Sequence, residues 1–194
     1  MPYALLSIPL FCALMRLFTR KYVFSALTTL SCAALVIVRA PVMAAALAVS
    51  AAGDWFMGHK GDNEGLYRMG ILCFLLAHVI FIAYALTRVK TVAVPLAVGA
   101  ALAAGYAVYL GTRVFGCVPA LLKIPVAAYS VISLIGFTCA LMTKDPLYAI
   151  GIGLLLFSDT MIAEHDFVGN TSAGLLILPT YYLCQMLVAL SGLL

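Results

Sequence analysis

Residues 71–86 read ILCFLLAHVIFIAYAL, an apolar run interrupted by a single histidine, His78. The strands of a membrane barrel alternate apolar and polar residues, and this run does not alternate. A helix crossing a bilayer needs roughly 20 predominantly apolar residues. The stretch therefore predicts a helix that is surrounded by lipid or by other apolar helices. Residues 42–52, VMAAALAVSAA, repeat the pattern.

The composition extends this interpretation to the whole chain. Hydrophobic residues make up 65% of the 194 positions and charged residues only 9%. A soluble domain has roughly 45–50% apolar and about 25% charged residues. The fold class predicted is therefore all-α, a polytopic integral membrane helical bundle with about eight transmembrane helices. Short polar breaks leave room for one transmembrane domain over residues 1–194, with predicted spans at 2–18, 23–38, 41–57, 67–87, 92–110, 117–142, 146–162 and 173–193.

The breaks between spans carry most of the charge. They include GHKGDNEGL at 58–66 and EHDFVGNTS at 164–172, which we interpret as solvated loops. The excess of Lys and Arg on one side of the predicted topology is too small to fix the orientation. The net charge of +4 suits anionic lipid headgroups and is no sign of nucleic-acid binding. A short multi-pass chain of this kind is typical of a bacterial inner (cell) membrane protein, although a protein of the endoplasmic reticulum would look similar.

Two aspartates end apolar spans that run in the same direction. Asp54 follows Gly53 near the end of the third predicted span, and Asp159 follows Ser158 near the end of the seventh. Each lies about four residues, or roughly 6 Å, inside its predicted helix end. Ionisable residues within spans are rare and usually face a bundle interior, so the pair is the first candidate for a functional site. The alternative is that both carboxylates face headgroups and water.

Other polar residues inside the spans are candidate substrate contacts. Tyr181 and Gln185 are four residues apart on the last span and share a helix face with each other. Lys123 could extend to the interface or hold a phosphate, and Arg68 and Arg113 are alternatives for the phosphate. His78 could equally be a structural hydrogen-bonding residue. The further candidates are Tyr129 and Tyr182.

Several kinds of site have no support in the sequence. The six cysteines are scattered without CxxC spacing, and the three histidines form no HxxxH pair, so neither a disulfide framework nor a zinc site is predicted. No GxSxG, P-loop or dinucleotide fingerprint occurs. The residues alone therefore predict neither a zinc site nor a nucleotide site.

Five stretches together resemble the YhhN family, the lysoplasmalogenases, from about residue 36 to the end. The order of their basic-x-Pro, Gly-Asp, Ala-His, Ser-Asp and Tyr-Tyr-x-x-Gln elements carries the resemblance. Trp55 departs from it, because an aliphatic residue or Phe would be expected after the Gly-Asp. The stretches are RAPVMAAALAVSAAGDWFM (39–57), FLLAHVIFIAYAL (74–86), PVAAYSVIS (125–133), LLLFSDTMIA (154–163) and TYYLCQMLVALS (180–191).

The resemblance implies an eight-span enzyme that cleaves the vinyl ether bond of lysoplasmalogens without a metal or an organic cofactor. Its partners would be a lysophospholipid substrate and membrane lipid, and its products a fatty aldehyde and glycerophosphoethanolamine or glycerophosphocholine. The resemblance places the acid/base pair at Asp54 and Asp159. The positions that it implies as supporting are His78, Tyr129, Tyr182 and Gln185.

The chemistry agrees with two carboxylates near the headgroups. A vinyl ether is hydrolysed after protonation at carbon, which needs a neutral acid and a carboxylate that stabilises the resulting cation, as in glycosidases. A different class remains open from the residues alone. Paired intramembrane carboxylates also serve proton relays, so a proton-coupled transporter of a lipid or small solute is the alternative.

Overall fold

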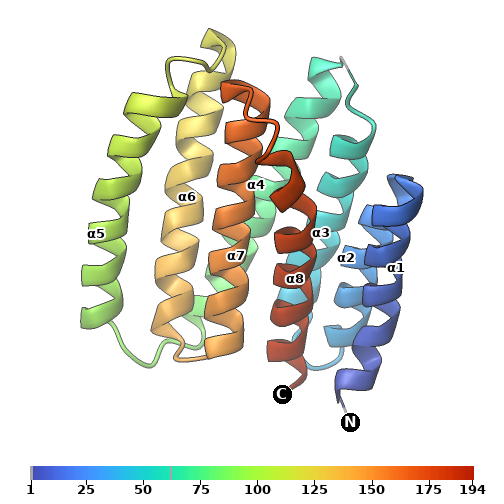
Figure 1. Ribbon diagram of the computed structural model, residues 1–194. Coiled ribbons are helices and arrows are strands. Elements are labelled where there is room, and N and C mark those ends of the chain that lie inside the picture. Colours follow the sequence, from blue (N-terminus) through green and yellow to red (C-terminus); the bar gives the residue numbers. More distant parts are fainter. Residues whose placement is uncertain (1, 62) are drawn as a thin grey trace. The chain divides into compact units, whose positions relative to one another are not determined.

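The computed structural model describes residues 2–61 and 63–194, and within these residues it is all-helical, with eight α-helices and no strand (Figure 1). The predicted fold class is confirmed. Short 3₁₀ turns at Pro2–Leu6 and Ala120–Leu122 precede α1 and α6, and π-turns at Leu110–Val114 and Glu164–Val168 extend α5 and α7. The α-helices are α1 Ser7–Thr19, α2 Val23–Val36, α3 Pro41–Gly58, α4 Glu64–Leu86, α5 Ala93–Tyr109, α6 Lys123–Met142, α7 Pro146–Ala163 and α8 Gly174–Leu193.

Two of the helices, α3 and α7, begin where the sequence offers a start signal. Pro41 and Pro146 stand in the first turn of α3 and α7, where a missing amide proton breaks no helical hydrogen bond. Asp145 caps α7 because its carboxylate accepts hydrogen bonds from the backbone amides of Leu147 and Tyr148, both at 3.1 Å. Within an apolar medium a helix satisfies its own backbone, which is why these apolar runs are helical throughout.

Six helical segments among the described residues are long and apolar enough to cross a membrane. They are α3, α4, α5 with its π-turn, α6 with the 3₁₀ turn before it, α7 with its π-turn, and α8. The helices before α3 are shorter apolar segments, Ala4–Thr19 and Val23–Val36. The protein is therefore an integral, multi-pass membrane protein whose first two helices are shorter than the rest.

The chain divides into two compact units. Unit one contains the residues up to Tyr84 together with Gln185–Leu194, and in it α1 packs on α2 and α2 on α3. Unit two contains Ala85–Cys184, and in it α6 packs between α5 and α7 (Figure 1). The helices α4 and α8 each contribute residues to both units. The single domain expected over 1–194 stays a prediction.

Some predicted boundaries are wrong. The sixth span was expected from residue 117, but Pro119 lies before the helix, in an extended conformation, and α6 begins at Lys123. The break expected at 164–172 is helical as far as Val168, because a π-turn continues α7. Asp159 therefore lies nine residues before the end of its helical segment rather than about four. Asp62, in the predicted 58–66 break, lies outside the described residues.

Candidate functional site

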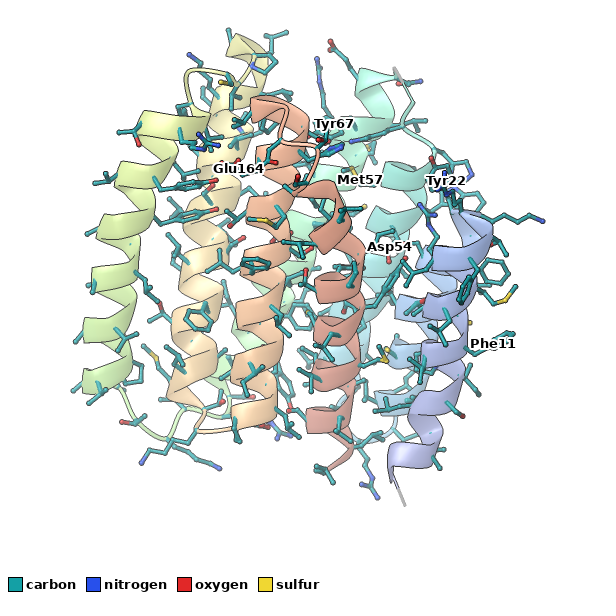
Figure 2. The ribbon with its side chains drawn as sticks, in the orientation of Figure 1. Phe11, Tyr22, Asp54, Met57, Tyr67 and Glu164 are labelled. Atoms are coloured by element: carbon teal, nitrogen blue, oxygen red, sulfur yellow. The ribbon has the colours of Figure 1, made fainter. Side chains whose placement is uncertain are left out.

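Asp54 is a buried carboxylate in unit one, with 6% of its surface exposed. It lies on α3 (Figure 2), and the hydroxyl of Thr29 on α2 donates a hydrogen bond of 2.6 Å to its Oδ2. Thr29 itself is fully buried. A carboxylate buried this deeply needs such donors, because an unpaired charge in an apolar interior is costly. The sequence predicted the carboxylate but not the threonine that holds it.

His78 lies on α4, also in unit one, with only 2% of its surface exposed. Its Nδ1 is 2.9 Å from the backbone carbonyl oxygen of Phe74, one turn earlier. The Phe74 ring also lies against α3, since a Cβ built on Gly53 would be 3.0 Å from that ring. Because Gly53, the residue before Asp54, has no side chain, α4 can approach α3 closely at this point. His78 therefore contacts the backbone of Phe74, and the ring of Phe74 packs against the residue next to Asp54.

Asp159 lies in unit two, on α7. Its carboxyl group hydrogen-bonds the hydroxyl of Tyr129 on α6, and the same hydroxyl interacts with Ser133 one turn further along α6. Two residues of the predicted site, Tyr129 and Asp159, are therefore brought together within one unit. Asp54 belongs to the other unit, and the convergence of the two aspartates on one site stays a prediction.

Two tyrosines of α5 accompany Asp159, and the sequence analysis did not identify them as site residues. The Tyr106 hydroxyl is 3.0 Å from Oγ1 of Thr160, the residue after Asp159, and Tyr106 is close enough to interact electrostatically with Asp159. The Tyr109 ring stacks on that of Tyr106, with centroids 5.7 Å apart. Their spacing of three residues is the signal that could have identified one polar helix face.

The predicted residues of α8 are all buried. Tyr181 and Tyr182 are in unit two, and Gln185 is in unit one with none of its surface exposed. Neither Oε1 nor Nε2 of Gln185 has a hydrogen-bond partner among the described residues. Buried polar groups nearly always have a partner, so this amide is suited to a polar group that comes from outside the chain.

The three predicted cations have different surroundings. Lys123 is exposed and is the first residue of α6, not six residues inside a span. Arg68 forms an exposed ion pair of 2.8 Å with Glu64 on the same helix. Arg113 pairs instead with Glu164, a residue that was placed in a solvated loop by the sequence analysis and is buried in the structure. This partner was missed because a π-turn extends α7 beyond the apolar run.

Neither Trp55 nor the side chains of the types that bind metals add to the site. Trp55, the residue that departs from the family pattern, is half exposed and packs on His59 with ring centroids 4.2 Å apart. Among residues 2–61 and 63–194, no group of three or more His, Cys, Asp or Glu side chains is placed to hold a metal ion. The cysteines in this part of the chain are free thiols.

Comparison with known families decides what these residues belong to. The YhhN family matches residues 15–192, nearly the whole chain. The chain belongs to the YhhN family. Searches of curated proteins and of solved structures gave no match. Both aspartates, His78 and Gln185 fall inside the matched range, and the activity known for the YhhN family is that of a lysoplasmalogenase.

Proposed function

We propose that this YhhN protein hydrolyses the vinyl ether bond of lysoplasmalogens, with Asp54 and Asp159 as its acid/base pair. The family match over residues 15–192 carries the proposal, because it includes both aspartates and the family has this activity. Each carboxyl group also accepts a hydrogen bond from a hydroxyl on a neighbouring helix, Thr29 for Asp54 and Tyr129 for Asp159. Such bonds orient a reacting group.

The reaction needs two carboxyl groups with different protonation states. One, as the neutral acid, transfers its proton to the vinyl carbon that does not bear oxygen, which leaves an oxocarbenium ion. The other, as a carboxylate, stabilises that cation and takes a proton from the water that adds to it. The hemiacetal then collapses to a fatty aldehyde and the free hydroxyl of the glycerophospho product.

The remaining candidates would bind rather than react. Gln185 offers a buried amide that has no hydrogen-bond partner among the residues the structure describes, and a lysolipid hydroxyl or ester oxygen could hydrogen-bond it. Tyr182 and His78 are buried as well, and would limit the water that reaches the reacting bond. Lys123 is exposed at the start of α6, where it could contact a headgroup.

The test is release of aldehyde from a lysoplasmalogen by purified protein. Asp54→Asn and Asp159→Asn should each abolish release while the thermal midpoint is retained. Asp145→Asn is the matched control, because it removes the same charge at the other end of α7 and asparagine still caps a helix. Full activity in either of the first two variants would refute the assigned mechanism.

A substrate series separates this chemistry from other lipid hydrolysis. Lysolipids with a vinyl ether, an alkyl ether and an acyl ester at the same position should be compared at equal chain length. Only the vinyl ether can be protonated at carbon, so cleavage of that lysolipid alone is expected. Cleavage of the acyl ester would point to an esterase, and uptake of a solute into proteoliposomes without any cleavage would favour a transporter.

A further inference from the structure

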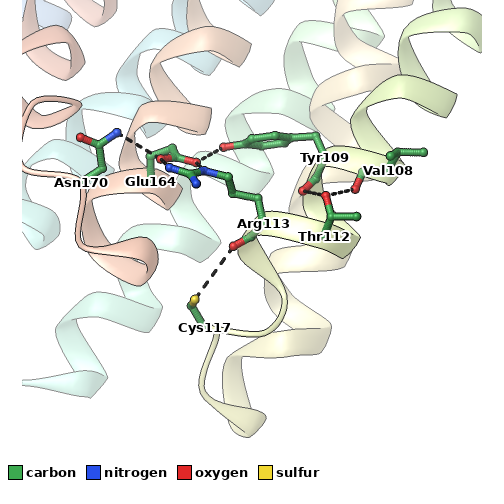
Figure 3. Close-up of polar contacts among 7 residues, drawn as sticks. All are labelled: Val108, Tyr109, Thr112, Arg113, Cys117, Glu164 and Asn170. Carbon is green, nitrogen blue, oxygen red and sulfur yellow. Dashed lines mark hydrogen bonds and ion pairs between the residues drawn. The ribbon is translucent and has the colours of Figure 1, made fainter.

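Glu164 is a buried carboxylate that the proposed reaction does not use. Only 5% of its surface is exposed. It accepts hydrogen bonds from Arg113 (Nε to Oε1 at 3.0 Å, Nη2 to Oε2 at 3.3 Å), from the Tyr109 hydroxyl at 2.7 Å and from the Asn170 amide at 3.2 Å (Figure 3). Four donors on one carboxylate fix its position, and with it the position of the arginine.

The backbone around this pair departs from a regular helix on both sides. Arg113 lies in the π-turn Leu110–Val114 and Glu164 in the π-turn Glu164–Val168, and the two turns pack on each other. Gly169, with a φ of 80°, then reverses the chain, so that the backbone N–H of Asn170 donates a hydrogen bond of 3.0 Å to the backbone carbonyl oxygen of Glu164. Both π-turns lie at the C-terminal ends of their helices, where such turns occur. Each of them contains one member of the ion pair.

Arg113 keeps part of its guanidinium group available. Its side chain is 56% exposed, whereas that of Glu164 is 7% exposed. Glu164 occupies Nε and Nη2, and Nη1 donates no hydrogen bond to any residue that the structure describes. A guanidinium group held on one edge by a carboxylate presents its other edge to a second anion, and its planar fork suits a phosphate.

A continuous row of polar side chains connects this pair to Asp159. Tyr109, which bonds Glu164, stacks on Tyr106, and Tyr106 contacts Thr160 beside Asp159. All of them belong to unit two. Asp159 and Glu164 are five residues apart, or roughly 7.5 Å along a helix. In a lysolipid the vinyl ether oxygen and the phosphorus are separated by the glycerol carbons and one ester oxygen, a similar separation.

We propose that Arg113, positioned by Glu164, binds the phosphodiester of the lysolipid, an inference that rests on the proposed function for its substrate. The arginine is then the residue that recognises a phosphate-bearing lysolipid and sets its vinyl ether at the depth of Asp159. Glu164 is a positioning residue, since it contacts the arginine and not the substrate.

The decisive experiment compares two substrates that share the reacting bond. Initial rates are measured on a lysoplasmalogen and on 1-alkenylglycerol, which has the same vinyl ether and no phosphate. Arg113→Ala should raise KM for the lysoplasmalogen about tenfold or more, the scale of a lost hydrogen bond to a charged group, with little change in kcat. Its kcat/KM for 1-alkenylglycerol should equal that of the wild type. An equal loss on both substrates, or an unchanged KM, would overturn the proposal.

Three further variants separate recognition from general effects of charge and folding. Lys90→Ala removes a cation from the exposed loop at the other end of α5 and should leave both substrates unaffected. Arg113→Lys keeps the charge but loses the fork, so part of the KM increase should remain. Glu164→Gln keeps the arginine but loosens its orientation, and should raise KM for the lysoplasmalogen alone. A Glu164→Gln variant that loses activity equally on both substrates would mean that the pair is only a structural clamp.

A binding measurement keeps this inference distinct from the proposed reaction. Affinity for an alkyl-ether lysophosphatidylcholine, which has no vinyl bond to cleave, is measured by calorimetry in detergent micelles. Weaker binding by Arg113→Ala, but not by Lys90→Ala, would support the phosphate site even if the wild type cleaved neither substrate. Equal affinity in all variants would refute it. Displacement by inorganic phosphate as effective as by the lysolipid would assign the site to free phosphate and overturn the lipid assignment.

Discussion

The hydrogen bond from Thr29 to Asp54 allows the role of this carboxylate to be measured. Thr29→Val replaces a fully buried hydroxyl by a methyl group of similar size and removes a bond of 2.6 Å between α2 and α3. Hydrogen bonds between membrane helices contribute about 0.6 kcal/mol on average and up to about 1.7 kcal/mol. Since about 1.4 kcal/mol corresponds to a tenfold change in rate, kcat should fall about 3- to 16-fold if the bond acts fully in the transition state.

The assay is steady-state aldehyde release from a lysoplasmalogen in defined micelles. KM should stay near its wild-type value, because Thr29 orients the reacting group and does not contact substrate. Thr29→Ser keeps the hydroxyl and should restore most of kcat. The matched control is Thr28→Val: Thr28 is equally buried on the same helix, but its hydroxyl bonds the backbone carbonyl of Phe24 at 2.7 Å. Wild-type kcat in Thr29→Val, or an equal loss in Thr28→Val, would refute the assigned role.

The remaining predictions concern the other residues of the site and its helices. Tyr129→Phe removes the hydroxyl that bonds Asp159 and should lower kcat by the same range as Thr29→Val; an unchanged kcat would contradict it. Gln185→Met replaces an amide without a partner among the described residues, so the thermal midpoint should rise while KM for lysolipid increases; a lower midpoint would show that the amide is satisfied. Asp145→Ala removes the cap of α7 and should cost about 1 kcal/mol of stability in reversible unfolding, whereas Asp145→Asn should be neutral. Dialysis against a chelator should leave aldehyde release unchanged, and a loss restored by a divalent metal would refute the purely carboxylate mechanism.

The apolar runs were sufficient to predict the eight helices. The run at 71–86 and the other apolar runs contain so few polar residues that they predict a helix in each run and its approximate position along the chain. Pro41 and Pro146 marked helix starts correctly because proline is favoured in a first turn. The start of the sixth span was predicted wrongly, because Pro119 was expected inside it and lies before the 3₁₀ turn at Ala120–Leu122.

The candidate site was predictable only in part. Asp54 and Asp159 were identified because each interrupts an apolar run, and Tyr129 proved to be bonded to Asp159. Thr29 was missed because a threonine in a membrane helix usually bonds its own backbone, as Thr28 does. Glu164 was missed for a different reason. Its burial depends on a π-turn, which follows from contacts with α5 and Asn170 that no local pattern reveals.

The shortness of α2 affects the lipid around Asp54. Its 14 residues extend roughly 21 Å, less than the roughly 30 Å of a typical hydrocarbon core. A bilayer adapts to a short helix by thinning locally, which brings headgroups and water inward beside it. Asp54 on α3 is bonded to this helix through Thr29, so a change in the thickness of the lipid beside α2 should reach the carboxylate. Lipid thickness thus becomes a variable of the reaction, and host bilayers of shorter acyl chains fit this end of the protein with less deformation.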